Sequence, residues 1–141
     1  MRGKIFTSEE ANRMLPLVAR IADDIVRTYR QVHDALRQLD ASKQAASEAH
    51  GAEAIRLESE IRAHDARVAE LLDRFQGLIE EIEALGGTVK DYERGAVDFY
   101  GELDGEIVYL SWSPGDEQIA FWHPLEDGAE ERRPLPTTIT L

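Results

Sequence analysis

The fold is decided by residues 91–128, which read DYERGAVDFYGELDGEIVYLSWSPGDEQIAFWHPLEDG. This stretch holds three runs rich in β-branched and aromatic residues and both tryptophans of the chain, a composition typical of short strands. Within it, Asp104-Gly105 is a strong signal for a two-residue hairpin turn. The sequence therefore predicts an antiparallel three-stranded β-meander over residues 88–126, followed by a C-terminal tail over residues 127–141.

The turns set the register that we expect for this meander. A turn at residues 104–105 places Leu110 opposite Phe99. A second turn at residues 113–116 most simply places Ile119 opposite Leu110. Because opposed residues share a face, one face is expected to be apolar and buried, with Glu117 and His123 at its ends. Its apolar members would be Val97, Phe99, Val108, Leu110, Trp112, Ile119 and Phe121.

The opposite face of the meander is expected to be amphipathic. In the same register it would present Asp98, Tyr100, Tyr109, Ser111, Gln118, Ala120 and Trp122. Aromatic rings beside polar groups suit a surface that binds a small molecule or another protein, and the alternative is that the chain's own tails cover this face. The candidate residues for binding a ligand or partner are Asp98, Tyr100, Tyr109, Trp122, His123 and Arg132.

Residues 7–86 carry a helical pattern. The segment TSEE at residues 7–10 is a capping box, after which apolar residues recur at spacings of three and four. A second run of this kind ends at Gly86-Gly87, which is a helix stop. A small, polar segment between the runs places the turn within residues 40–53. The pattern predicts a long antiparallel helical hairpin.

Together the hairpin and the meander predict an α+β fold in a single domain that covers residues 1–141. Lys4–Phe6 and Thr137–Leu141 are candidates for additional strands at the edges of the sheet. Two helices alone cannot bury apolar stripes as wide as these. The further layer is supplied either by the strands or by a second copy of the hairpin. We expect the second, a homodimer in which the hairpins of two copies form a coiled-coil-like four-helix bundle.

The composition excludes several classes of function. The formal net charge is -12, and residues 87–141 carry twelve acidic side chains against four basic ones. Nucleic-acid binding requires a basic surface, so we expect no nucleic-acid partner. The chain has no Cys, which excludes disulfides and thiolate chemistry. No apolar run is long enough for a signal peptide or a membrane span. We therefore expect a cytoplasmic protein without a membrane partner.

The candidate catalytic residues are His123 and Asp98, because an imidazole and a carboxylate together can perform acid/base chemistry. The candidate metal ligands are His123, Asp98, Asp91 and Glu117. In the expected register, however, Asp98 and His123 lie on different faces of the meander. This separation favours a non-catalytic homodimeric binding module without a cofactor. The alternative is a metal-dependent or acid/base enzyme with His123 and Asp98 at its site.

The segments TVKDYERGAVDFYGELDGEIVYLSW and GDEQIAFWHPLEDG, together with the opening FTSEEANRMLPLV, resemble domain-of-unknown-function family 2203. This family consists of small prokaryotic proteins without an assigned activity. Its members often carry Cys where this chain has Ser111. The resemblance implies the α+β fold and leaves the function open. By this resemblance the signature positions are Asp91, Gly95, Val97, Asp98, Phe99, Asp104, Gly105, Trp112, Gly115, Ile119, Trp122, His123, Gly128, Arg132 and Pro134.

Overall fold

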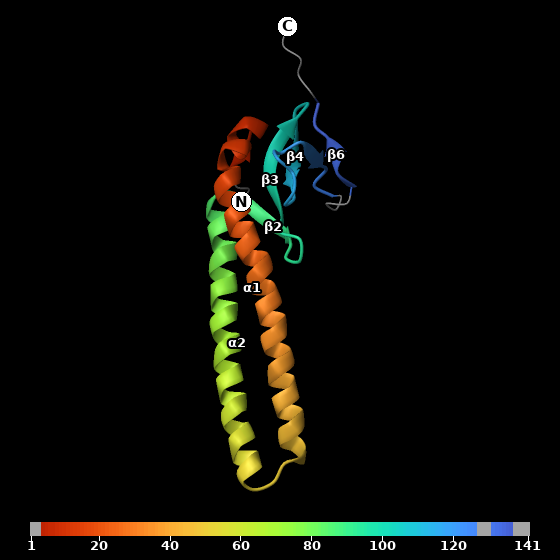
Figure 1. Ribbon diagram of the computed structural model, residues 1–141. Coiled ribbons are helices and arrows are strands. Elements are labelled where there is room, and N and C mark those ends of the chain that lie inside the picture. Colours follow the sequence, from red (N-terminus) through yellow and green to blue (C-terminus); the bar gives the residue numbers. More distant parts are fainter. Residues whose placement is uncertain (1–3, 127–130, 137–141) are drawn as a thin grey trace. The chain divides into compact units, whose positions relative to one another are not determined.

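The computed structural model describes residues 4–126 and 131–136 (Figure 1). They form two long helices followed by a sheet, so the predicted α+β class is confirmed. The chain divides into two compact units, which are described separately. The first unit comprises Met1–Val26 and Leu78–Leu141, and the second comprises Arg27–Gly77.

Helix α1 (Ser8–Glu48) begins at the capping box that the sequence predicts. The backbone N–H of Thr7 donates to Oε1 of Glu10 over 2.9 Å, and the backbone N–H of Glu10 donates to Oγ1 of Thr7 over 3.1 Å. These two bonds satisfy amide groups that have no partner within the helix itself. Helix α2 (Ala52–Ala84) follows after a connection at residues 49–51. Within the described part of the chain, neither helix is apolar enough over a sufficient length to cross a membrane.

The second unit consists of the facing parts of α1 and α2. Its core is one apolar cluster, with Ile61 packed against it. The cluster consists of Val32, Ala35, Leu39, Val68 and Leu71. Three large apolar side chains of this unit remain exposed, namely Leu36 at 43%, Ile55 at 70% and Leu72 at 48%. The hairpin therefore buries a single inner row and leaves other apolar residues in contact with solvent.

The sheet of the first unit is built around two long central strands. The strands are β1 (Ile5–Phe6), β2 (Gly87–Asp91), β3 (Ala96–Leu103), β4 (Glu106–Trp112), β5 (Phe121–His123) and β6 (Arg133–Pro134). Their order is β1-β3-β4-β5-β6, and β2 pairs with the same edge of β3 as β1 does. Strand β1 runs parallel to β3, which confirms the edge strand predicted at Lys4–Phe6. The other predicted edge strand, Thr137–Leu141, lies outside the described residues. The sequence did not predict β2 and β6 as separate strands.

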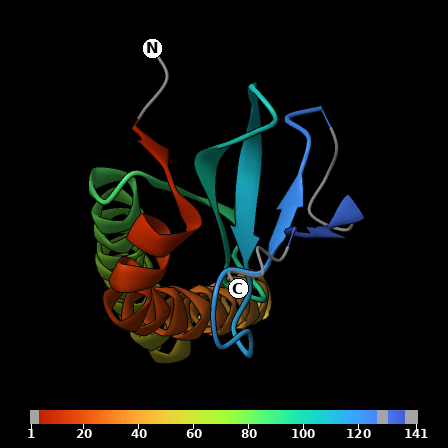
Figure 2. The ribbon, with the colours of Figure 1, turned by 90° about the horizontal axis from the view of Figure 1, so that it is seen from above.

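The register between β3 and β4 is the predicted one. Leu110 pairs with Phe99, and Trp112 pairs with Val97. All four side chains are buried, and the Phe6 ring meets the Phe99 ring edge-on at 5.4 Å between centroids. Figure 2 shows the first turns of α1 and the last turns of α2 on one side of this sheet. The buried face is therefore the side toward the helices.

The register between β4 and β5 differs from the predicted one by three residues. Trp122 pairs with Leu110, where the sequence predicted Ile119. The cause lies in the segment after the turn, because the backbone N–H of Ile119 donates to Oδ1 of Asn12 on α1 over 2.6 Å. This bond ties the segment to the helix at Ile119, and residues 117–120 do not pair with β4. A shift by an odd number of residues turns a strand over, so every side chain of β5 lies on the face opposite to the predicted one.

Candidate functional site

The corrected register brings polar and aromatic side chains together on the side of the sheet away from the helices, here called the outer face. One row across the outer face consists of Thr88, Asp98, Ser111 and Phe121. The neighbouring row consists of Tyr100, Tyr109 and His123. Both residues proposed for acid/base chemistry therefore lie on this face.

His123 and Asp98 form a direct contact, with Nε2 of the imidazole 2.8 Å from Oδ2 of the carboxyl. The prediction that they lie on different faces was wrong, because it rested on the unshifted register of β5. The two residues lie on strands that do not pair with each other, and β4 runs between those strands. The imidazole therefore reaches across β4, and the contact ties β5 to β3. Only 2% of the His123 side chain and 0% of the Asp98 side chain are exposed.

The second ring nitrogen of His123 is also engaged. Nδ1 lies 3.1 Å from the carbonyl oxygen of Pro124. A carbonyl oxygen only accepts hydrogen bonds, so Nδ1 carries a proton. The contact between Nε2 and Asp98 then needs one further proton, held either by the carboxyl or by the ring. Both nitrogens of the imidazole are thus occupied by groups of the protein, and the ring presents no free nitrogen to a substrate.

The burial of Asp98 raises the pKa of its carboxyl above the ordinary value of 3.8. Removing a carboxylate from water disfavours its charged form. His123 and Lys90 act in the opposite direction without reversing the rise in pKa. Oδ1 of Asp98 and Oγ of Ser111 are buried without a hydrogen-bond partner. Ser111 is not bonded to His123, so the three residues do not form the relay that activates a serine nucleophile.

An aromatic surface adjoins the His123–Asp98 contact. The Tyr109 ring stacks on Tyr100 with 5.2 Å between centroids and an interplanar angle of 20°, and it also contacts His123 at 5.2 Å. The ammonium of Lys90 lies 4.4 Å from the centroid of the Tyr109 ring, a cation–π arrangement. Both tyrosines are partly exposed and Lys90 is exposed. These three residues are here called the tyrosine surface, and it is the accessible part of the site.

Comparison with known families gives a match over almost the whole chain. The model of the family described as "Uncharacterized conserved protein (DUF2203)" matches residues 4–135. The chain belongs to this family. No curated protein and no solved structure matches the chain. Membership in the DUF2203 family therefore agrees with the resemblance seen in the sequence, and it assigns no reaction or ligand.

In this DUF2203 protein, two of the predicted binding residues lie away from the tyrosine surface. Trp122 pairs with Leu110 and so lies on the opposite face of the sheet. The guanidinium of Arg132 is bound by Oδ2 of Asp116 over 2.5 Å and stacks on the Phe121 ring at 4.0 Å. Trp122 was misplaced by the same register error as His123. Arg132 holds the last described residues to the turn between β4 and β5.

Of the four predicted metal ligands, His123 and Asp98 come together, whereas Asp91 and Glu117 do not join them. Asp91 accepts backbone hydrogen bonds from Glu93 and Arg94 and so closes its own turn. Glu117 is exposed, in the segment that is bound to α1. Across residues 4–126 and 131–136, no three His, Cys, Asp or Glu side chains are grouped so that they could hold a metal ion.

Lys90 of the tyrosine surface was not predicted from the sequence. The alternation of Thr88, Val89 and Lys90 is nevertheless a signal for a strand, and it places Lys90 on the outer face.

Proposed function

We propose that this protein is a non-catalytic homodimeric binding module, in which the helical hairpins of two copies associate and the outer face of each sheet contacts a partner. The closed contact between His123 and Asp98 carries this proposal. Its two side chains are almost completely buried, and both ring nitrogens have partners within the protein. The polar centre of the outer face thus supports the fold and positions the neighbouring aromatic rings.

The tyrosine surface has the properties of a recognition surface. Partly exposed aromatic rings contribute large contact areas at a small cost in conformational entropy, and tyrosine is enriched at protein interfaces. The stacking of Tyr109 between Tyr100 and His123 restricts the rings before a partner binds. The partner is either another protein or a small molecule. The acidic charge of the strand region argues against nucleic acid.

The exposed apolar residues of the second unit support self-association. A pair of helices has two broad sides, and the core of this hairpin uses only its inner row. Leu36 and Leu72 are each about half exposed. Helix pairs with exposed leucines commonly bury them against a second pair in a four-helix bundle. A second copy of the chain supplies such a pair.

The homodimer is tested by light scattering coupled to size-exclusion chromatography at micromolar concentration. The wild-type chain is expected to show twice the 15.9 kDa mass of one copy. The double variant Leu36→Glu/Leu72→Glu is expected to show the mass of one copy, because each buried Leu contributes about 1.5–3 kcal/mol and a buried carboxylate adds a further penalty. Gln38→Glu, which adds one carboxylate at an exposed polar position of α1, should remain dimeric. A monomeric wild-type chain would contradict this part of the proposal.

An acid/base enzyme is the second candidate function, and the convergence of His123 and Asp98 is the observation that favours it. Paired titratable groups with shifted pKa values are a feature of active sites, and burial raises the pKa of Asp98. Catalysis at this pair would require His123 to release one of its two partners and to become accessible to a substrate. A metal-dependent version would require a third ligand in addition to these two.

A further inference from the structure

Two buried polar atoms at the centre of the outer face have no hydrogen-bond partner among the described residues. They are Oδ1 of Asp98 and Oγ of Ser111. The two residues pair directly across β3 and β4, and both are buried. The other carboxyl oxygen of Asp98, Oδ2, is bound by His123. Buried polar atoms without a partner are uncommon, because each one destabilises the fold. A bound group that satisfies both atoms would remove this cost.

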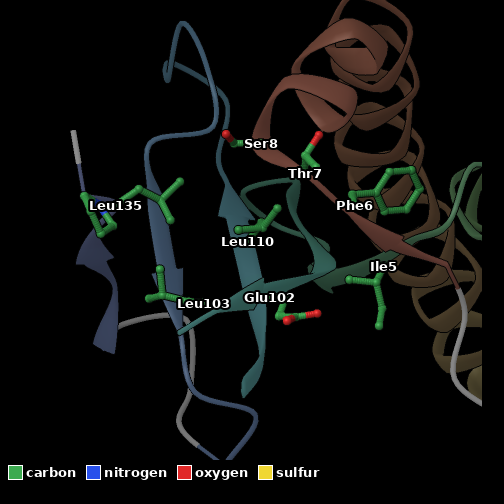
Figure 3. Close-up of a pocket in the computed structure, with 9 residues that line it drawn as sticks. Ile5, Phe6, Thr7, Ser8, Glu102, Leu103, Leu110 and Leu135 are labelled. Carbon is green, nitrogen blue, oxygen red and sulfur yellow. The ribbon is translucent and has the colours of Figure 1, made fainter. Parts of the chain in front are cut away.

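The two atoms are approached from the outer face. The hollow of about 410 Å³ at the end of the sheet (Figure 3) is a different place, because its lining includes neither Asp98 nor Ser111. The register places both side chains on the outer face, in the row that Thr88 and Phe121 continue to either side. A ligand for these atoms must therefore enter between the side chains that cover this row.

The side chain of Lys90 covers Asp98. Strand β3 lies between β2, which carries Lys90, and β4, which carries Tyr109. Thr88 pairs with Asp98, so Lys90 starts on one side of this row, and Tyr109 lies on the other side. The ammonium of Lys90 lies 4.4 Å from the centroid of the Tyr109 ring. To reach that ring, the stem of Lys90 has to cross β3 above Asp98.

This cover is held by a weak contact. Lys90 is exposed, and its contact with the Tyr109 ring is a cation–π interaction, which contributes little at an exposed site. Exposed side chains change rotamer within picoseconds to nanoseconds. The Lys90 side chain can therefore leave the ring at a small cost, without any change in the strands beneath it.

The chemistry of the two atoms suits a neutral primary carboxamide. Oδ1 of Asp98 accepts a hydrogen bond, and the hydroxyl of Ser111 both donates and accepts. A carboxamide combines an N–H donor with a carbonyl acceptor, so it can satisfy both atoms at once. A carboxylate would offer only acceptors to Oδ1, and a cation would be repelled by the ammonium of Lys90 nearby.

We propose that Lys90 is a movable cover, beneath which the outer face binds a small molecule with a primary carboxamide on an aromatic ring. The amide N–H donates to Oδ1 of Asp98, the amide carbonyl accepts from Oγ of Ser111, and the ring of the ligand packs on Tyr109. The space that Lys90 leaves is one side chain wide, which suits a small molecule. This inference rests on the outer face being a binding surface, as proposed above, and it leaves the contact between His123 and Asp98 closed.

Titration of the isotope-labelled full-length chain with benzamide, followed by two-dimensional NMR, tests the proposal. The Hε protons of Lys90 adjoin the Tyr109 ring and should resonate upfield; benzamide should return them toward the ordinary lysine position and shift the amides of Thr88 and Ser111. We expect binding on the order of 1 mM, as is typical of a fragment of this size. Benzoate and acetophenone have the same shape without the N–H donor, and each should bind about five- to tenfold more weakly.

Two variants separate the polar floor from its cover. Ser111→Ala should weaken benzamide about fivefold and leave the stability of the chain unchanged or slightly higher, because it removes a buried hydroxyl that has no partner. Lys90→Ala should strengthen benzamide about two- to fivefold, because the ligand no longer has to displace the cation–π contact. Ser59→Ala, at an exposed position of α2, is the control and should change neither quantity.

Three results would overturn the proposal. They are a clear loss of stability in Ser111→Ala, which would show that Oγ has a partner within the protein, equal binding of benzamide and acetophenone, and unchanged affinity in Lys90→Ala. Benzamide shifts at Tyr109 without movement of the Lys90 signals would overturn the covered site alone and leave the binding role of the outer face standing. No shifts on the outer face with any of the three probes would contradict both.

Discussion

His123→Ala is expected to lower the free energy of unfolding by about 3–5 kcal/mol, the cost of removing one member of a buried polar pair. The variant leaves the Asp98 carboxyl buried without its partner and removes the link between β5 and β3. Urea denaturation of both proteins at pH 7, followed by far-ultraviolet circular dichroism, measures the difference. A loss below about 1 kcal/mol would mean that the contact does not support the fold.

Variants of Asp98 provide the matched controls. Asp98→Ala should be as damaging as His123→Ala, whereas Asp98→Asn should cost less because its amide can donate to Nε2 of His123. The double variant Asp98→Ala/His123→Ala should lose less than the sum of the two single losses, since neither member then remains unpaired. Losses that add fully would show that the two side chains do not depend on each other.

Because the pKa of Asp98 is raised, the difference in stability between the wild type and Asp98→Asn should depend on pH. A carboxyl whose pKa is higher in the folded state binds its proton more tightly there, so protonation stabilises the fold. This contribution to the free energy of unfolding is complete below the ordinary pKa of 3.8 and is lost as the pH rises through the folded-state pKa. The stability of the wild type relative to Asp98→Asn should therefore be greatest at acidic pH and decrease as the pH increases. An increase with pH would contradict the assigned direction.

Phe99→Ala is expected to destabilise the first unit by about 3–5 kcal/mol, the range for removing a buried phenylalanine ring. Phe99 is 0% exposed and packs against the Phe6 ring, so its loss leaves a cavity between the sheet and the helices. Thermal and urea denaturation both report this change. The effect should appear without any change at the tyrosine surface in the fraction of protein that remains folded.

The adjacent residue is the control for this prediction. Tyr100 follows Phe99 on β3 but points to the outer face, where it is partly exposed. Tyr100→Ala should cost clearly less than Phe99→Ala, because the Tyr100 ring is partly exposed and its removal leaves no closed cavity. Similar losses for the two variants would contradict the register, in which Phe99 lies on the buried face and Tyr100 on the partly exposed outer face.

The parts of the fold with strong local signals were predictable from the sequence. The capping box located the start of α1, and the Asp-Gly turn fixed the pairing of β3 with β4. Asp104 has a φ of 52° and Gly105 a φ of 81°, the positive values that a two-residue hairpin requires. This local turn sets the register between β3 and β4, so the pairing was predictable without knowledge of contacts between distant residues.

The pairing of β5 depended on a contact that local signals do not contain. The hydrogen bond from Ile119 to Asn12 joins residues that are 107 positions apart. It moves the start of the strand by three residues and turns His123 toward Asp98. Asp98, Tyr100, Tyr109 and His123 were recognisable as candidates from their residue types, while their arrangement on one face required the tertiary structure. The same error placed Trp122 on the wrong face.

The most direct test of the central claim is the protonation of the His123 ring, measured by long-range 1H–15N NMR on the full-length chain. The closed contact predicts that Nδ1 carries a proton that exchanges slowly with water, because it is buried and bound to the carbonyl of Pro124. It also predicts that the signal changes when Asp98 is replaced by Asn. A ring with an unprotonated Nδ1, or one whose protons exchange freely with solvent, would show an accessible imidazole and contradict the structural role of this pair.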